Sequence, residues 1–446
     1  MIDKYKVPVE QLKVTYNMSK AGFKTTDDIE PLKGIIGQDR AIRALEFGLQ
    51  TNRRGYHIYV SGQSGTGRNS FVHHLTSEKA SNRDVPKDWI YVYNFNDSNK
   101  PLAIGLNAGD GKAFKEEIEH MISGIRKDIE NAFESKDYES MKNALFKQYD
   151  DESKNLIQEL NKIAEKFDFR FFQTDKGLMS TPLKDGEPMK EEEYRSLSKE
   201  DYENLREKSN SLGLETVDIF NEIKDLEEEY QKRFKNLDNE FGAKIIDIYI
   251  EKIKNKFSYC TKAVEYCSML REDIIEHISN FKKGDEDRNN PLAILQITSS
   301  PEAFFKWYNV NLFVDNSSRT CAPLIIENHP TYKNLLGSID YKMEMGIART
   351  DFTYIKSGSL HQANGGYIIL QVSEILSNTF AWEGLMRALI TSEICIEGVE
   401  SQYGFASPLA LKPEPIPLDV KVILIGNPYI YSLLLNYDKN LKSSLK

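Results

Sequence analysis

The segment 58–70 constrains the fold most, because an apolar alternation there runs into two spaced glycines. Ile58 and Val60 lead to Gly62, and the spacing Gly62-x-x-x-x-Gly67 leads into a predicted helix. This is the outline of a phosphate-binding loop. Glycines let backbone N–H groups turn toward an anion, and the helix N-terminus adds the positive end of its dipole. The segment therefore predicts a strand, a phosphate cradle and a helix of an α/β protein.

Two positions of this loop depart from the phosphate-binding pattern. Arg68 stands where a lysine normally contacts the phosphates, and Asn69 stands where a Ser or Thr hydroxyl normally binds Mg²⁺. Ser70 comes one position late, about 100° round the helix axis. We predict that a nucleotide contacts Gly62, Gly65, Thr66, Gly67, Arg68, Asn69 and Ser70. The loop is expected to hold a phosphate without efficient chemistry on it.

Composition narrows the class of protein. A chain of 446 residues with 40% hydrophobic content can build two or three domains. Its formal charge of −10 argues against a dedicated nucleic-acid binder. The charged N-terminus does not fit a signal peptide, and no run of 18 apolar residues occurs. We expect a cytoplasmic protein without a membrane span, whose four cysteines are reduced thiols and not metal ligands.

Strands and helices alternate around the glycine loop and again near the C-terminus. A helix over 69–80 and an aromatic, β-branched strand over 88–95 follow the loop, which predicts a βαβ unit and a parallel sheet. After a linker at 284–291, strands are predicted at 310–314, 367–370, 394–397 and 420–425.

The middle of the chain has a different character, with apolar residues at helical spacing from about 113 to 281. Turn residues at 169–188 predict a small β-hairpin, and Ser198-x-x-Asp201 restarts the helix as a capping box. One interpretation is a solvated structural bundle. The other is an arm whose tip exposes Phe169, Phe171 and Phe172 to unfolded chains.

Several motifs in a fixed order carry a family resemblance. They are PLKGIIGQDRAIRALEFGL, GYHIYVSGQSGTGR, DWIYVYNF, VNLFVDN, NLLGSIDY, TDFTYIKSGSLHQANGGYIIL, FAWEGLMRALITSEICIE and LKPEPIPLDVKVILIG. Together they resemble the Lon-related AAA+ proteins of the LonC-like group of ATP-dependent proteases. The resemblance implies an α/β fold, in which a P-loop AAA+-like parallel sheet is interrupted by a long helical, coiled-coil-like insertion with a small β tip. We place the first half of the core at 1–112, the arm at 113–283 and the second half at 284–446.

The resemblance also implies an activity and partners. Members of the family form hexameric rings that bind ATP or ADP, act on unfolded or misfolded proteins, and join the ATPase module to a protease domain with a Ser-Lys dyad. Ser443, Ser444 and Lys446 lie in a polar tail that does not supply such a dyad. We therefore expect the chain to end before the helical lid and the protease domain. Membrane and nucleic-acid partners are not expected.

The resemblance assigns roles to residues outside the loop. Ile36 and Gly37 correspond to a segment that packs around adenine, although an ordinary capped helix would read the same way. Gln371 and Val372 occupy the acidic motif, where an Asp binds Mg²⁺ and a Glu activates water, so Mg²⁺ binding is doubtful. Asn427 corresponds to a γ-phosphate sensor, or is a turn residue before Pro428.

Three further predictions keep an alternative beside them. Arg349 and Arg387 are inter-subunit arginines or form surface ion pairs, and the segment 341–352 lines a central channel or is a packed hairpin. For the whole chain we favour a Lon-related module degenerate in ATP hydrolysis. The alternatives are an active remodelling ATPase that uses Glu374 or a residue of a partner as its acid, and a non-enzymatic assembly protein with a relic loop.

Overall fold

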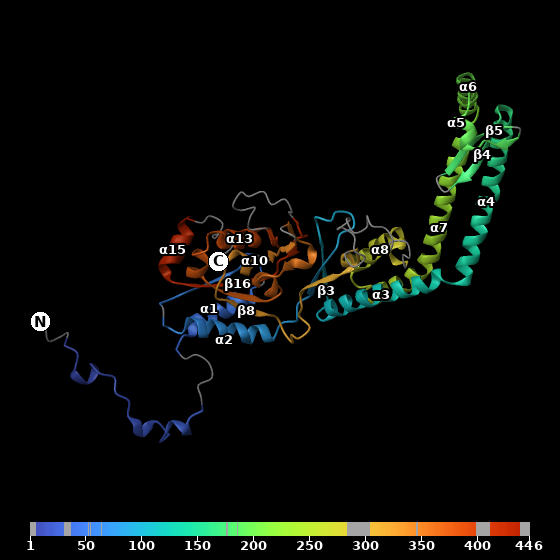
Figure 1. The fold of residues 1–446 in the computed structure, drawn as a ribbon. Helices are drawn as coiled ribbons and strands as arrows, with labels where there is room; N and C mark the ends of the chain where they lie inside the picture. The colour runs from blue at the N-terminus through green and yellow to red at the C-terminus, as the bar shows by residue number, and fades with distance from the viewer. Residues whose placement is uncertain are drawn as a thin grey trace.

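The computed structural model describes residues 6–30, 37–51, 53, 55–63, 65–174, 177–184, 186–282, 304–344, 347–397 and 411–437. The predicted linker at 284–291 lies outside these ranges. Figure 1 shows an α/β body, a long helical arm that leaves it on one side, and an N-terminal segment on the other side. This segment holds short 3₁₀ turns at Val9–Gln11, Met18–Lys20 and Thr26–Asp28, and none of them buries a residue. The predicted α/β class with a helical insertion is confirmed.

The body is built on a parallel sheet of four strands in the order β1-β16-β13-β8. These strands are β1 (Ile58–Ser61), β8 (Leu324–Glu327), β13 (Tyr367–Gln371) and β16 (Lys421–Gly426). The two central strands read as continuous apolar runs because helices cover both of their faces. Because all pairs are parallel, the ends of β1, β13 and β16 lie along one edge beside the glycine loop.

Helices cover the two faces according to the period-2 alternation of the strands. α1 (Asp39–Gln50) and α2 (Arg68–Ser81) pack on the face that carries Ile369, Ile423 and Ile425. The opposite face carries Ile368, Leu370, Val422 and Leu424. It is covered by α10 (Tyr332–Leu336), α11 (Ser359–Gln362), α12 (Val372–Leu376), α13 (Thr379–Thr391) and α15 (Pro428–Tyr437).

A second sheet is antiparallel and corrects the βαβ prediction. β2 (Asp88–Val92) lies between β3 (Leu102–Leu106) and β7 (Val310–Val314), and both pairings are antiparallel. The strand after α2 therefore does not join β1, whose partner is β16. Buried apolar strands of either sheet look alike in sequence, so the pattern predicted the strand but not its partner. Short two-stranded pairs complete the body: β9 (Ser338–Ile339) with β12 (Ile355–Lys356), β10 (Lys342–Glu344) with β11 (Ile347–Arg349), and β14 (Glu393–Ile394) with β15 (Ile416–Pro417).

The base of the arm shares one hydrophobic core with the antiparallel sheet. α3 (Asp110–Phe133), the end of α7 (Val217–Lys256) and α8 (Thr261–Glu276) enclose this core. The predicted apolar positions of α3, namely Phe114, Ile118, Met121, Ile125 and Ile129, are all buried. The buried carboxylate of Asp88 ties the sheet to the start of α3, since it accepts N–H groups of Gly109 and Gly111 at 2.8 and 2.9 Å.

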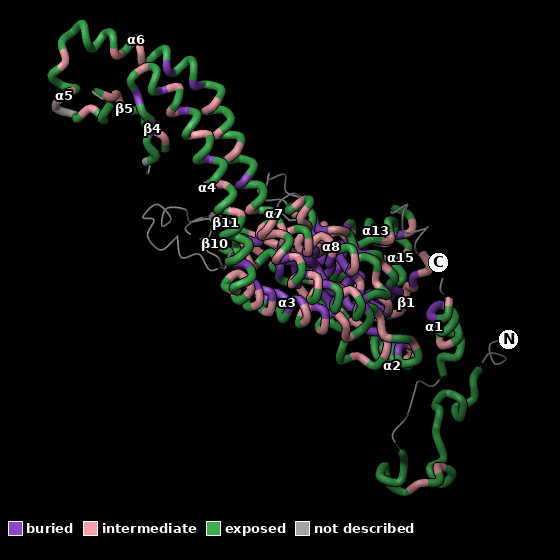
Figure 2. Tube along the Cα trace, turned by 90° about the vertical axis from the view of Figure 1, so that its right-hand side faces the viewer, coloured by how far each residue is buried: buried purple, intermediate pink, exposed green. Residues whose placement is uncertain are grey.

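Beyond the base, α4 (Lys136–Ala164) and α7 run side by side to the tip, and Figure 2 shows that most of this shaft is exposed. The tip holds β4 (Phe169–Thr174), β5 (Gly177–Lys184), β6 (Glu187–Pro188), α5 (Glu191–Arg195) and α6 (Lys199–Glu215). The predicted hairpin and the Ser198 cap are therefore present. The predicted exposure of Phe169 and Phe171 is wrong: they are 4% and 7% exposed, because they pack with Leu160 and Leu212.

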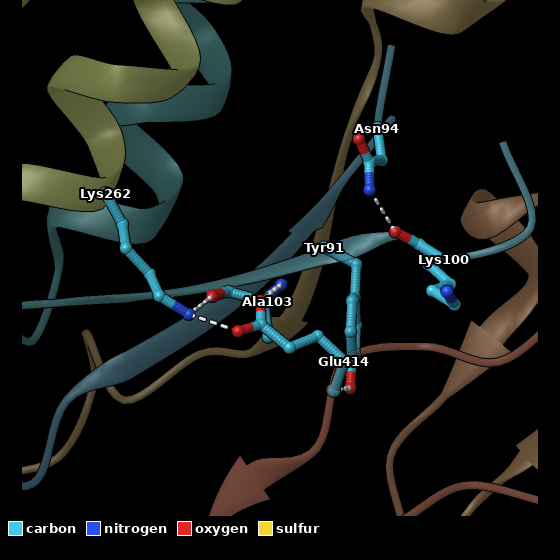
Figure 3. Close-up of polar contacts among 6 residues, drawn as sticks. All are labelled: Tyr91, Asn94, Lys100, Ala103, Lys262 and Glu414. Carbon is cyan, nitrogen blue, oxygen red and sulfur yellow. Dashed lines mark hydrogen bonds and ion pairs between the residues drawn. The ribbon is translucent and has the colours of Figure 1, made fainter. Parts of the chain in front are cut away.

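One glutamate fastens the segment before β16 to the base of the arm, as Figure 3 shows. Its carboxylate accepts the Lys262 ammonium of α8 at 2.5 Å and the Ala103 N–H of β3 at 3.0 Å. The carbonyl of the same residue, Glu414, accepts the Tyr91 hydroxyl at 2.8 Å. Since β16 begins seven residues after Glu414, these contacts hold the segment that leads into the parallel sheet against β3 and α8 at the base of the arm.

Candidate functional site

The glycine loop has the backbone that a phosphate cradle needs. β1 ends at Ser61 and α2 begins at Arg68, with Gly67 as the N-cap residue. Gly65 and Gly67 have φ values of 83° and 78°, a left-handed conformation that glycine adopts without a steric cost. A Cβ added at either position would meet nothing within 4 Å, so the loop backbone is open on that side. The local geometry fits an anion seated on the N-terminus of α2.

The two positions predicted to lack magnesium ligands lie in contact. Gln371 ends β13, Asn69 lies in the first turn of α2, and the Gln371 Nε2 donates to the Asn69 Oδ1 at 3.1 Å. The fold therefore brings together residues that are 302 positions apart in sequence. Mg²⁺ prefers charged or strongly polar oxygen ligands, whereas two neutral amides here satisfy each other. This donor set does not fit a magnesium ion.

The residue after Gln371 has no catalytic capacity. Val372 is fully buried in the core beside α13, so its side chain does not face the loop. Glu374 is exposed in the short helix α12. Within the described ranges, no group of three or more His, Cys, Asp or Glu side chains is arranged to hold a metal ion.

Arg68 is turned toward the end of β16. Its Nη1 donates to the carbonyl of Gly426, which also accepts the Gly62 N–H at 3.3 Å. A Cβ at Gly62 would lie 2.8 Å from the Arg68 Cδ, so a side chain there would force the arginine stem to move. The guanidinium thus closes the loop against the sheet in this arrangement.

Asn427 is engaged as a helix cap. Its Oδ1 accepts the Ile430 N–H of α15 at 2.8 Å, which is the geometry of an N-terminal cap. Its carbonyl accepts the Tyr59 hydroxyl at 3.0 Å, and the Tyr59 ring lies 4.7 Å from that of Tyr431. Sequence reasoning missed these two tyrosines, which lie together where β1 meets α15. The one available signal was the tyrosine within the short strand β1.

The other residues predicted to contact a nucleotide are only partly described by the structure. Ile36 lies outside the described residues, while Gly37 has φ 79° and is exposed just before α1. The Thr66 hydroxyl donates to the Gln63 carbonyl at 2.8 Å, and Ser70 is exposed.

Two of the predicted surface features are partly described. Arg387 pairs with Glu397 at 3.2 Å on the surface, which is the simpler of its two interpretations. The predicted channel segment forms the β10–β11 hairpin, whose residues 345 and 346 are outside the described ranges. Among the described helices, none combines the length and apolar character that a membrane crossing needs.

Comparison with solved structures gives distant similarities. One structure of NtrX from Brucella abortus is 14% identical over 41% of this chain and 39% of that chain, with a TM-score of 0.19. Structures of NtrX with ADP and with ATP are each 17% identical over 44% of this chain and 40% of that chain, with TM-scores of 0.18. The matched part spans less than half of the NtrX chains. Comparison with curated proteins gives no match.

Comparison with family models is more informative. A LonB-like AAA domain matches residues 320–446, which include β8, β13 and β16 of the parallel sheet. The helical domain of Lon-like LonC proteins matches residues 88–121, from β2 into α3. The two matches fall on the body and on the base of the arm in the order that the resemblance predicted. The chain is a Lon-related AAA+ protein.

Proposed function

We propose that the chain is the ATPase-like, substrate-engaging module of an intracellular protein-degradation system, and that it binds ADP or ATP with little or no hydrolysis. The contact between Asn69 and Gln371 at 3.1 Å carries this proposal. In the proposed site, neutral amides stand at both points where a hydrolytic site holds its magnesium, next to a loop whose backbone suits a phosphate. A cytoplasmic location and a hexameric ring belong to the same proposal.

Within this site, the chain's own groups would bind and not react. The N–H groups at the start of α2 would hold the phosphates, and Arg68 would screen their charge if it left Gly426. A nucleotide supplies only its binding energy here. Its occupancy would set the position of α2 relative to β16, and through Glu414 that of the arm base.

Calorimetry of the full chain with ADP and ATP, with and without Mg²⁺, tests the proposal. We expect saturable binding that changes less than about twofold when Mg²⁺ is added, and no phosphate release above background. Steady Mg²⁺-dependent turnover would favour the alternative in which Glu374 acts as the acid. A complete lack of binding would leave the relic-loop alternative.

We also propose that the arm tip contacts unfolded protein, through a different set of side chains from the one predicted. Met179, Tyr194 and Tyr202 are 58%, 41% and 47% exposed there. A cavity of about 430 Å³ is lined by the two tyrosines, together with Met189, Phe169 and Leu205, whereas Met179 lies outside this lining. The lining is mixed, since Ser180 and Arg206 stand beside the aromatic and aliphatic side chains. A surface cavity with two exposed tyrosines offers apolar contact to varied hydrophobic side chains, which binding of unfolded chains requires.

The double variant Tyr194→Ser/Tyr202→Ser is expected to bind a permanently unfolded protein about tenfold more weakly, because the rim supplies most of the apolar contact. Reduced and alkylated lactalbumin, followed by fluorescence anisotropy, is a suitable probe. Phe146→Ser is the matched control, since Phe146 is 59% exposed on the shaft of the arm. Equal losses in both variants would show that the tip has no special role.

A further inference from the structure

A cavity lined by several charged side chains lies at the edge of the parallel sheet opposite the glycine loop. Its volume is about 460 Å³, and it is lined by residues that precede β1 and that begin β16, among them Tyr56, His57 and Lys421. Because β1 and β16 are parallel, the starts of both strands meet at this edge and their ends meet at the loop. The two sites are therefore separated by the length of the strands.

A buried lysine forms the floor of this cavity. Lys421 is 7% exposed, and its Nζ donates to the carbonyls of Thr51 at 2.6 Å and Tyr56 at 2.7 Å. Among the described residues, no carboxylate lies within ion-pair distance of this ammonium. Desolvation and then the charge of Arg83 lower the pKa of Lys421. A charge buried without a counter-ion is costly, so the protein keeps this lysine at a price in stability.

Further cations surround the same cavity. Arg83 follows the C-cap of α2 and has a side chain that is 32% exposed, and Arg53 is exposed at the rim. The lining contains one carboxylate, that of Asp419, which lies 3.5 Å from Arg83 and is 84% exposed. Three cations against one solvated carboxylate make a local positive site on a chain of net charge −10.

We infer that this cavity binds a small oxyanion, a phosphate or a carboxylate group, between Arg83 and Lys421. The guanidinium offers a planar fork to two oxygens, and the ammonium has a third proton beyond the two that Thr51 and Tyr56 accept. Asp419 competes for the same fork from the solvent side. Leu389 and Leu418 are among the other lining residues, so a small apolar body attached to the anionic group would find apolar contacts there.

Calorimetry with inorganic phosphate and, separately, with succinate tests this inference and distinguishes the two sources of the oxyanion. Arg83→Gln is expected to weaken binding of the preferred anion about tenfold, since it removes a charge-assisted fork. Asp419→Asn is expected to strengthen it about threefold, since it removes the competing carboxylate. Opposite signs from two neighbouring substitutions are not produced by a general loss of folding.

The variant Gly65→Asp separates this cavity from the glycine loop, because a carboxylate and a side chain at a left-handed glycine disable the loop for anions. We expect the anion affinity of the cavity to persist in this variant. Phosphate binding that disappears in Gly65→Asp and is unchanged in Arg83→Gln would assign the anion to the loop and overturn the inference. The inference would also be overturned if neither phosphate nor succinate bound saturably at concentrations up to about 10 mM.

Discussion

The double substitution Asn69→Thr/Gln371→Asp is expected to make nucleotide binding depend on Mg²⁺. The Asn69 Oδ1 and the Gln371 Nε2 are 3.1 Å apart. Two neighbouring ligands of an octahedral Mg²⁺, each about 2.1 Å from the ion, lie about 3 Å from each other. The Thr hydroxyl and the Asp carboxylate each end one bond nearer the backbone than the amide they replace. They would therefore lie farther apart than 3.1 Å, with room for the ion between them.

We expect Mg²⁺ to tighten ATP binding about 30- to 100-fold in the double variant and to leave the natural chain nearly unaffected. Each single variant should gain much less, because it leaves one amide in the coordination shell. The pair is therefore expected to be strongly non-additive in a double-mutant cycle. Titration calorimetry with ATP over a series of Mg²⁺ concentrations gives the four affinities.

Asn69→Thr/Gln371→Asn is the matched control, since Asn has the shape of Asp without its charge. A magnesium response in this control as large as that of the Asp variant, or no response in the Asp variant, would show that the two positions do not face a nucleotide-bound ion. Hydrolysis is not expected to return in either case. Val372 is buried in the core where a water-activating acid would be needed, and a charge there would disrupt packing.

The contact that carries this prediction shows what sequence could and could not provide. The spacing Gly62 to Gly67 predicted the loop, and the family resemblance placed Gln371 at the end of a strand, so both halves of the site were predicted separately. Their contact was not, because it depends on β13 lying beside β16 and not beside β2. Sheet order is a property of long-range pairing, which a local apolar pattern does not encode.

The arm shows the same limit at the level of single side chains. Helical spacing predicted the buried face of α3, since a helix fixes which residues share a face. At the tip, Phe169 and Phe171 looked like exposed aromatics next to turn residues, but α4 and α6 cover them. Lys421 was overlooked for a related reason: a lone lysine at the start of an apolar strand gives no sign of the cations that the fold gathers around it.

Acidification from pH 7 to pH 5 is expected to destabilise the protein strongly, because two histidines are buried in neutral form. Burial lowers the pKa of His361 to about 3, and burial followed by the Lys421 charge lowers the pKa of His57 to about 4. Each ring nitrogen Nδ1 accepts a backbone N–H, from Gly358 at 3.2 Å and from Val422 at 3.3 Å. Protonation at that atom would remove an acceptor inside the core.

The sign follows from proton uptake. A histidine in the unfolded chain titrates near pH 6.5, so below that pH the unfolded state binds protons that the native state does not. The contribution of the two histidines to the free energy of unfolding is therefore fully present above about pH 6.5. It is lost as the pH falls toward their pKa values in the folded protein, which are about 4 for His57 and about 3 for His361. At about 1.4 kcal/mol per pH unit for each group, the two histidines together lose about 4 kcal/mol by pH 5.

Urea unfolding at pH 7, 6 and 5 measures this loss. Other groups also titrate. Carboxylates with lowered pKa values, such as Glu117 and Asp247, lose their contribution to stability mainly below pH 5. Burial raises the pKa of Asp88 and Asp273, so protonation of these two groups favours the folded state as the pH falls.

Comparison with variants therefore isolates the histidines. His57→Gln and His361→Gln are each expected to remove about half of the slope even if they lower stability at pH 7. His73→Gln, on the exposed side of α2, should leave it unchanged. If the natural chain and the three variants lose stability equally per pH unit, the acid sensitivity belongs to groups other than His57 and His361.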